Sequence, residues 1–194
     1  MNTAPVTLER TTTETAVRAT LGGEPGRVRV ETSLNALTHF LTQLGFYWGI
    51  GLELEAEDRF PLGDGHHLAE DAALVLGRAL DRLLGDRSGI ARYGQRWLPM
   101  DEALALAAVD AGGRPFAAVD APLAGRAVGE LAGENVLHFF RTFAAEGRLT
   151  LHLKVTGENA HHVAEAAFKA LGMALAEATA PRDGGVRSTK GVLS

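Results

Sequence analysis

Hydrophobic and polar positions recur along the chain with two different periods, and each period predicts one kind of element. Alternation at every second residue predicts strands over residues 11–21, 27–32 and 51–57. Apolar positions that recur every three or four residues predict helices over residues 34–44 and 66–84. The glycine-rich stretch between the first two strands predicts a turn, which would join those strands as a hairpin.

The second half of the chain repeats this order of elements. Its pattern predicts strands over residues 90–98, 101–110, 115–119 and 149–155, and helices over residues 134–146 and 160–178. The alanine-rich residues 101–110 would also suit a helix, but they stand where a hairpin partner belongs, so we favour a strand. Each half therefore predicts strands, helix, strand and helix. We expect an α+β fold of two pseudo-symmetric repeats, each an antiparallel sheet packed against two helices.

The length of the chain bounds how these repeats are organised. Its 194 residues suit one large domain or two small, tightly joined ones. We place the first repeat at residues 1–87 and the second at residues 88–180. The remaining residues, 181–194, are glycine-rich and polar, which is typical of a mobile arm unless something binds it.

A quartet of potential metal ligands occurs once in each half. The first quartet is His39, His66, His67 and Glu70, and the second is His138, His161, His162 and Glu165. Each quartet contains an HHxxE box at the start of a predicted helix. Residues i, i+3 and i+4 of a helix share a face, whereas adjacent residues project about 100° apart, so the two histidines of one box can serve different ions.

We expect two pseudo-equivalent metal sites, each built from the three histidines and the carboxylate of one quartet. The alternative is that these are surface or capping histidines, which is the commoner role of any single histidine. The duplication of the whole pattern favours metal binding. The remaining histidine, His152, has no counterpart in the other half, so we interpret it as structural.

Composition excludes several classes of function. A formal net charge of −5 with no basic patch argues against nucleic-acid binding. No run of 18 apolar residues occurs, so we expect no membrane span, and residues 1–10 lack the core of a signal peptide, so we expect a cytoplasmic protein. The chain has no cysteine. Any metal must therefore be held by imidazole and carboxylate, which suits Mn, Fe, Co or Zn.

Motifs over nearly the whole chain resemble one enzyme family. They are RTTTET at residues 10–15, HHLAED at 66–71, GIARYG at 89–94, PMDEAL at 99–104, GRP at 113–115, HFF at 138–140, TLH at 150–152, HHVAEAAFKA at 161–170 and STKG at 188–191. Each motif alone is weak. Because the motifs occur in this order over the full length, the chain resembles imidazoleglycerol-phosphate dehydratase of histidine biosynthesis.

The resemblance implies a Mn-dependent hydro-lyase that converts D-erythro-imidazole glycerol phosphate to imidazole acetol phosphate. It implies two Mn²⁺ ions per active site, which act as Lewis acids and stabilise the substrate's imidazole ring as an anion. It also implies repeats with a ribosomal protein S5 domain 2-like fold. The assembly that it implies is a homo-oligomer of twenty-four subunits with active sites between subunits.

The resemblance also assigns roles to individual residues. It implies catalytic roles for Glu14, Glu165 and Lys169, with Glu14 as the general acid and base. It implies that substrate is bound by Glu14, Gln43, Arg92, Arg114, Lys169, Ser188 and Lys190. Ser188 and Lys190 would belong to a C-terminal arm, residues 181–194, that lies over the phosphate. Without the resemblance, the two arginines would be expected in surface salt bridges, and the serine and lysine in a disordered tail.

The chain departs from the family pattern at three positions near the predicted ligands. Thr38 and Gly65 stand where the family has aspartates, and Tyr47 stands where it has a histidine. The lost aspartates would be partners that orient imidazoles, so their loss could weaken metal binding or change the substrate. Two other functions remain open: a metal-storage or metal-sensing oligomer without catalysis, and a zinc hydrolase.

Overall fold

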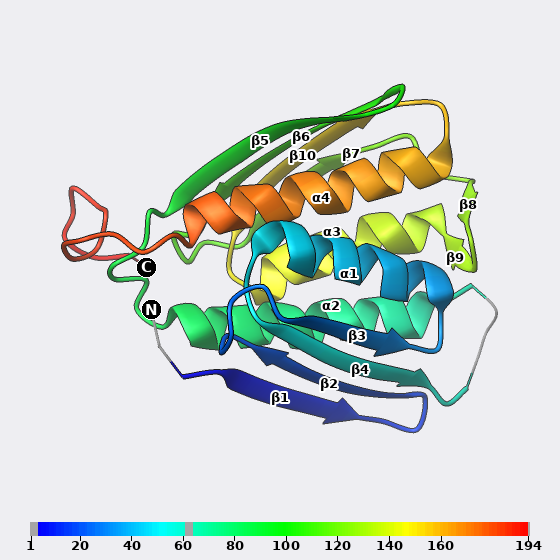
Figure 1. Ribbon diagram of the computed structural model, residues 1–194, viewed down its shortest axis with the longest axis horizontal. Helices are drawn as coiled ribbons and strands as arrows, with labels where there is room; N and C mark the ends of the chain where they lie inside the picture. The colour runs from blue at the N-terminus through cyan, green and yellow to red at the C-terminus, as the bar shows by residue number, and fades with distance from the viewer. Residues whose placement is uncertain (1–3, 61–63, 194) are drawn as a thin grey trace.

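Two four-stranded sheets enclose a central layer of helices in the computed structural model (Figure 1), which describes residues 4–60 and 64–193. The first half contributes β1 (Val6–Thr11), β2 (Thr15–Leu21), β3 (Val28–Thr32), α1 (Asn35–Trp48), β4 (Leu52–Asp58) and α2 (His66–Leu84). The second half contributes β5 (Tyr93–Met100), β6 (Ala103–Asp110), β7 (Phe116–Asp120), β8 (Ala127–Val128), β9 (Leu131–Ala132), α3 (Gly133–Glu146), β10 (Thr150–Thr156) and α4 (Ala160–Ala178).

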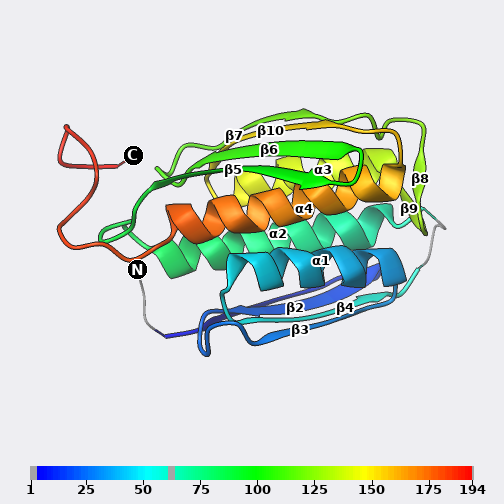
Figure 2. The same cartoon turned by 45° about the horizontal axis from the view of Figure 1, so that its top comes forward.

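This arrangement confirms the α+β class and the repeated order of strands, helix, strand and helix. Figure 2 shows the same three layers from a second direction, with the sheet of the first half on one side of the helices and the sheet of the second half on the other. The alanine-rich residues 103–110 form β6, which pairs antiparallel with β5 as predicted. The predicted boundary between the repeats falls in the connection between α2 and β5.

The predicted pairing of residues 11–21 with 27–32 as a hairpin is wrong. The order of the first sheet is β1-β2-β4-β3, so β2 lies between β1 and β4, and β3 pairs parallel with β4 at the edge. The second sheet has the matching order β5-β6-β10-β7, with β7 parallel to β10. Each sheet is therefore mixed rather than antiparallel, because a helix connects its two parallel strands as a crossover.

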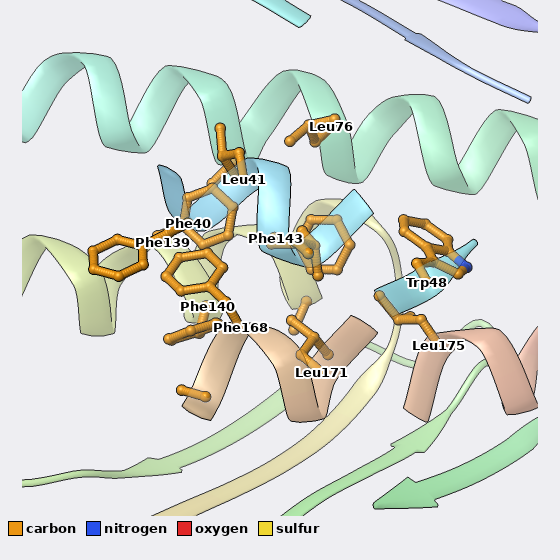
Figure 3. Close-up of a cluster of buried hydrophobic side chains, with 14 of the residues drawn as sticks. Phe40, Leu41, Trp48, Leu76, Phe139, Phe140, Phe143, Phe168, Leu171 and Leu175 are labelled. Atoms are coloured by element: carbon orange, nitrogen blue, oxygen red, sulfur yellow. The ribbon is translucent and has the colours of Figure 1, made fainter. Parts of the chain in front are cut away.

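The helices pair across the two halves. Helix α1 packs on α4, and α2 packs on α3, so one contiguous core is shared by both repeats. Figure 3 shows the aromatic centre of this core. The Phe40 and Phe168 rings stack with centroids 5.3 Å apart, and the Phe140 ring lies 4.6 Å from Phe168. Phe40 and Phe139 directly follow His39 and His138, so burial of each phenylalanine fixes the helix turn that carries the histidine.

A glycine at the same place in each repeat permits these helix pairs to approach closely. A Cβ atom at Gly172 of α4 would lie 2.7 Å from the backbone oxygen of Leu44 in α1. A Cβ atom at Gly77 of α2 would lie 2.8 Å from the backbone oxygen of Phe143 in α3. Each glycine stands seven residues after the glutamate of its HHxxE box. Glycine therefore sets the distance between the helices that carry the predicted ligands.

None of the helices in the described part of the chain is both long enough and apolar enough to cross a bilayer.

Replacing Gly172 by leucine should separate α1 from α4. The new side chain would meet backbone atoms of α1, which cannot move without displacing the aromatic core, so we expect a loss of about 3 kcal/mol in the free energy of unfolding. Urea denaturation measures this loss. Gly185→Leu is the control, because a Cβ atom there meets nothing within 4 Å; equal stability of the two variants would contradict the prediction.

Candidate active site

Both HHxxE boxes lie in the first turn of a helix, and local contacts fix those turns. The Asp64 carboxylate accepts a hydrogen bond from the backbone N–H of His66 at 3.0 Å. The side-chain oxygen of Asn159 accepts from the backbone N–H groups of His161 and His162 at 2.8 and 3.3 Å. Helices α2 and α4 begin at the same end of the molecule (Figure 1), so both boxes are presented there.

The first cluster of ligands joins α1 to α4. The Nε2 atoms of His39 and His161 lie 3.2 and 3.0 Å from Oε2 of Glu165. The two imidazole rings stack with centroids 5.3 Å apart. One ligand atom from each of the three residues falls within 4.8 Å of the others. Two imidazole nitrogens and a carboxylate oxygen at this spacing fit a borderline divalent cation such as Mn²⁺ or Zn²⁺.

The second cluster joins α3 to α2 in the same way. Nε2 of His138 lies 3.2 Å from Oε1 of Glu70, and Nε2 of His66 lies 3.6 Å from Oε2 of the same carboxylate. The two rings again stack, at 5.7 Å. Nδ1 of His66 bonds the side-chain oxygen of Asn135 at 3.0 Å, and Asn135 is itself held through its amide by the backbone oxygen of Asp64. This contact turns Nε2 of His66 towards the carboxylate.

The predicted grouping of ligands by half is therefore wrong. Each cluster takes one histidine from one half and an HHxxE histidine and glutamate from the other, because α1 packs on α4 and α3 on α2. The second histidine of each box lies outside both clusters. Nδ1 of His67 is 3.5 Å from the Glu14 carboxylate, and Nδ1 of His162 is 2.8 Å from the Glu102 carboxylate.

Glu165 is buried, with 7% of its surface exposed, yet it is held as a carboxylate. Burial raises the pKa of Glu165, but hydrogen bonds from Lys169 and His39 outweigh burial, and the net pKa is lowered. The ammonium of Lys169 donates to Oε1 at 2.7 Å, which leaves Oε2 facing the two histidines. A charged oxygen between two imidazoles is the arrangement that a metal ion requires.

Two further residues of α1 lie on the same side of the helix as His39. Gln43 and Tyr47 follow His39 by one and two helical turns. The ammonium of Lys169 lies 5.4 Å from the centre of the Tyr47 ring, so the ring face stabilises the lysine that holds Glu165. Tyr47 stands where the family pattern has a histidine, and its observed contact is with this predicted catalytic lysine.

The residues predicted to bind phosphate are brought together around a cavity of about 510 Å³. Its lining includes Arg92, Arg114, Ser188 and Lys190. Arg114 is mostly exposed, with one nitrogen 3.8 Å from Asp110. Arg92 donates two hydrogen bonds to the Asp110 carboxylate, at 2.7 and 2.9 Å. The salt bridge expected of an ordinary arginine is thus present, and it holds Arg92 in place at the cavity.

Arg92 also fastens the C-terminal arm. Its Nη1 donates to the backbone oxygen of Arg187 at 2.8 Å, and Arg187 donates in turn to the backbone oxygen of Ala91 at 2.9 Å. Both guanidinium groups lie over the ring of Tyr93, at 4.7 and 5.8 Å from its centre. These contacts carry residues 188–193 to the edge of the cavity.

The cavity and the histidine clusters lie at opposite ends of the molecule. His161 begins α4, whereas the backbone N–H of Arg92 bonds the backbone oxygen of Ala178 at the far end of the same helix. At 1.5 Å per residue, the 17 residues between His161 and Ala178 span about 25 Å. Figure 1 shows the arm and the helix starts at the two ends. One small substrate cannot bridge this distance.

Packing accounts for two of the departures from the family pattern. The Thr38 hydroxyl accepts the backbone N–H of Thr32 at 3.1 Å and so ties α1 to the end of β3. Gly65 has a φ of 72°, and a Cβ atom there would lie 2.7 Å from Leu34 and 2.6 Å from Leu131. An aspartate at position 65 would need both leucine side chains to shift and would have to adopt a left-handed backbone conformation.

The structure adds two polar residues that the sequence did not single out. Asn135 and Glu102 each bond Nδ1 of an HHxxE histidine. No motif marks Asn135, and Glu102 was visible only as part of the PMDEAL motif.

His152 is exposed on the outer face of β10, with its ring 5.7 Å from that of Phe116. It lies outside both ligand clusters.

Comparison with known proteins identifies the family of this chain. A sequence model of imidazoleglycerol-phosphate dehydratase matches residues 32–175. This chain belongs to the imidazoleglycerol-phosphate dehydratase family. A relative from Pyrobaculum calidifontis is 50% identical over 95% of this chain and 97% of its own, and one from Caldivirga maquilingensis is 46% identical over 96% and 97%. The solved structure of the Pyrococcus furiosus family member has a TM-score of 0.83 and 39% identity, covering 96% of this chain and all of its own.

Removing the Lys169 ammonium should change the acid stability of the metal-free protein. The lowered pKa of Glu165 means that its carboxylate stabilises the fold above its usual pKa of 4.5, and that this contribution is lost as the pH falls through the lowered pKa. Lys169→Met should cost about 2 kcal/mol at neutral pH, and the deficit should shrink on acidification.

Urea unfolding between about pH 3 and pH 7 measures this dependence. Lys154→Met, on the exposed face of β10, is the control and should change little at any pH. A deficit for Lys169→Met that stays constant across this range would contradict the assignment of Lys169 as the partner of an ionised Glu165.

Proposed function

We propose that this chain, a hydro-lyase of histidine biosynthesis, dehydrates imidazole glycerol phosphate with two Mn²⁺ ions held by its crossed histidine–glutamate clusters. The observation that carries this proposal is the pair of His–His–Glu clusters at one end of the molecule. The cationic cavity at the other end supplies a place for the phosphate. A metal-storage function would not explain the cationic cavity. A zinc-hydrolase function would not explain why the motifs occur in the family's order.

The reaction removes a proton from a carbon that is not next to a carbonyl group. Bound Mn²⁺ would supply Lewis acidity that stabilises negative charge on the imidazole ring of the substrate. Loss of the carbon-bound proton and of hydroxide yields one water and an enol, which becomes the ketone by moving its hydroxyl proton to carbon. The chain must therefore provide a group that accepts and returns a proton, and groups that hold the phosphate.

Glu14 is the proton-transfer group in this proposal. It lies in the turn between β1 and β2, half-exposed, with its carboxylate 3.5 Å from His67. This position at the ligand end leaves the carboxylate free to face a substrate. Lys169 and Gln43 lie beside the first cluster and would contact substrate oxygens. Glu165 serves as both ligand and partner of Lys169.

In this proposal the phosphate binds in the cavity, between groups of the arm and the two arginines that line it. Arg114 and Lys190 are exposed cations at its edge, and the Ser188 hydroxyl and the unused N–H groups of Arg92 complete the donors. The length of α4 separates this cavity from the ligands of the same chain. A complete site therefore needs the phosphate cavity of one copy beside the clusters of another.

This requirement supports a homo-oligomer with active sites between subunits, of twenty-four copies in the family arrangement. His67 and His162 fit the same idea, since they lie outside the clusters of their own chain and can complete the ligand set with a neighbouring copy. A cytoplasmic location is part of the proposal and rests on the biosynthetic role of the family.

The metal-stripped protein should show no dehydration of imidazole glycerol phosphate until Mn²⁺ is added. Glu14→Gln should keep Mn²⁺ binding and lose about 10²–10⁴-fold in kcat, because the amide cannot accept the proton. Glu9→Gln, which removes an exposed carboxylate of β1, should retain full activity. Product formation without metal, or a fully active Glu14→Gln protein, would contradict the proposal.

Removing residues 182–194 should raise KM sharply, because the arm supplies Ser188 and Lys190 to the phosphate cavity. A single change, Lys190→Ala, should raise KM by about 10-fold, the cost of one charge-assisted hydrogen bond, with kcat little changed. Steady-state kinetics measure both values. Arg182→Ala, in the same arm but outside the cavity lining, is the control. An unchanged KM in the truncated protein would rule out this role.

A further inference from the structure

The two repeats also match in a pair of glutamates that the ligand quartets do not include. Glu14 directly precedes the first residue of β2, and Glu102 directly precedes the first residue of β6. Each carboxylate contacts the second histidine of the HHxxE box of its own half, His67 at 3.5 Å and His162 at 2.8 Å. The duplicated unit therefore contains a carboxylate in the turn as well as the two histidines and the helix glutamate.

The Glu102 carboxylate is firmly fixed. One of its oxygens accepts the backbone N–H groups of Glu158 and Asn159 at 3.2 and 2.7 Å, in the loop that begins α4. The other oxygen faces Nδ1 of His162. With two backbone donors on one oxygen and the imidazole at the other, the carboxylate is held in place as a hydrogen-bond acceptor.

An acceptor at this position determines the state of the imidazole. A carboxylate can only accept, so Nδ1 of a neutral His162 must carry the proton, and Nε2 must hold the lone pair. Nε2 of His162 lies 3.7 Å from the exposed Asp101 carboxylate, on the opposite side of the ring from Glu102. A histidine fixed in this tautomer and orientation is prepared to bind a metal through Nε2.

We propose that Glu102 is a positioning residue that holds His162 in the Nδ1–H tautomer, with Nε2 available to Mn²⁺. This inference rests on the proposed metal-dependent function. It also gives the two turn glutamates different tasks. Glu102 is immobilised by two backbone donors and orients a ligand, whereas Glu14 lies farther from its histidine and is half-exposed, as a proton-transfer group must be.

Glu102→Gln is the informative variant, because the side chain keeps its shape but not its two acceptors. The amide oxygen is needed by the N–H groups of Glu158 and Asn159, so the amide nitrogen must face His162. It would then donate to Nδ1 and force the proton to Nε2. Glu158→Gln removes a neighbouring exposed charge and leaves the Glu102 contact in place, so it is the matched control.

Two measurements on the metal-stripped, full-length protein test the proposal. Long-range ¹H–¹⁵N spectra of ¹⁵N-histidine-labelled protein, recorded above the imidazole pKa, should show His162 as the Nδ1–H tautomer in wild type and as Nε2–H in Glu102→Gln. Titration calorimetry with Mn²⁺ should show one class of sites weakened by about 10–100-fold in Glu102→Gln, the usual effect of losing such a partner. Glu158→Gln should match wild type in both.

An Nε2–H tautomer in the wild-type protein would overturn the proposal without any variant. Unchanged Mn²⁺ affinity in Glu102→Gln would overturn it as well. A lower melting temperature with unchanged tautomer and affinity would leave Glu102 only a role in holding the loop before α4, which also overturns it. Failure of the wild-type protein to bind Mn²⁺ would instead remove the proposed metal dependence, whereas the tautomer measurement would still judge Glu102 by itself.

Discussion

The close packing of helices from opposite halves is the constraint on which the rest of the molecule depends. Backbone atoms of α1 and α4 approach at Gly172, and those of α2 and α3 approach at Gly77. Because these pairs cross the repeat, each ligand cluster forms only when both halves are folded together. The buried phenylalanines beside His39 and His138 then fix the helix turns from which the ligands project. The grouping of the predicted ligands and the packing of the core are thus consequences of the same contacts.

The two ends of this helical layer carry different chemistry. The helix starts present imidazoles and carboxylates, and the far ends of α2 and α4 adjoin the arm and its cations. Because α4 is rigid and about 25 Å separates His161 from Ala178, substrate cannot contact both ends of one chain. In the assembly proposed above, several copies would bring the two ends together, and the geometry of the active site would then be a property of the oligomer. The arginine contacts that fasten the arm just before β5 hold the cationic groups around the cavity.

Duplication gave the chain two similar halves, and packing then made them unequal. The Glu165 carboxylate is buried and paired with Lys169, whereas the Glu70 carboxylate is more exposed, and the histidine beside it, His66, is oriented by Asn135. The outer surface of the first sheet is dominated by charged residues of β2, β3 and β4, whereas that of the second sheet exposes Trp97 and Phe116.

The sequence by itself determined the repeat, the order of elements, the ligand types and the family. Periodicity located α2 and α4 within their observed bounds because these helices have long apolar faces. It could not give strand partners, since alternation describes one strand at a time, and so β3 was paired wrongly. It also assigned His39 to the wrong cluster, because α1 packs on α4, and the partner of a helix cannot be read from the pattern of that helix alone. Only the tertiary structure decided which residues meet, since contacts between distant segments follow from how surfaces fit together.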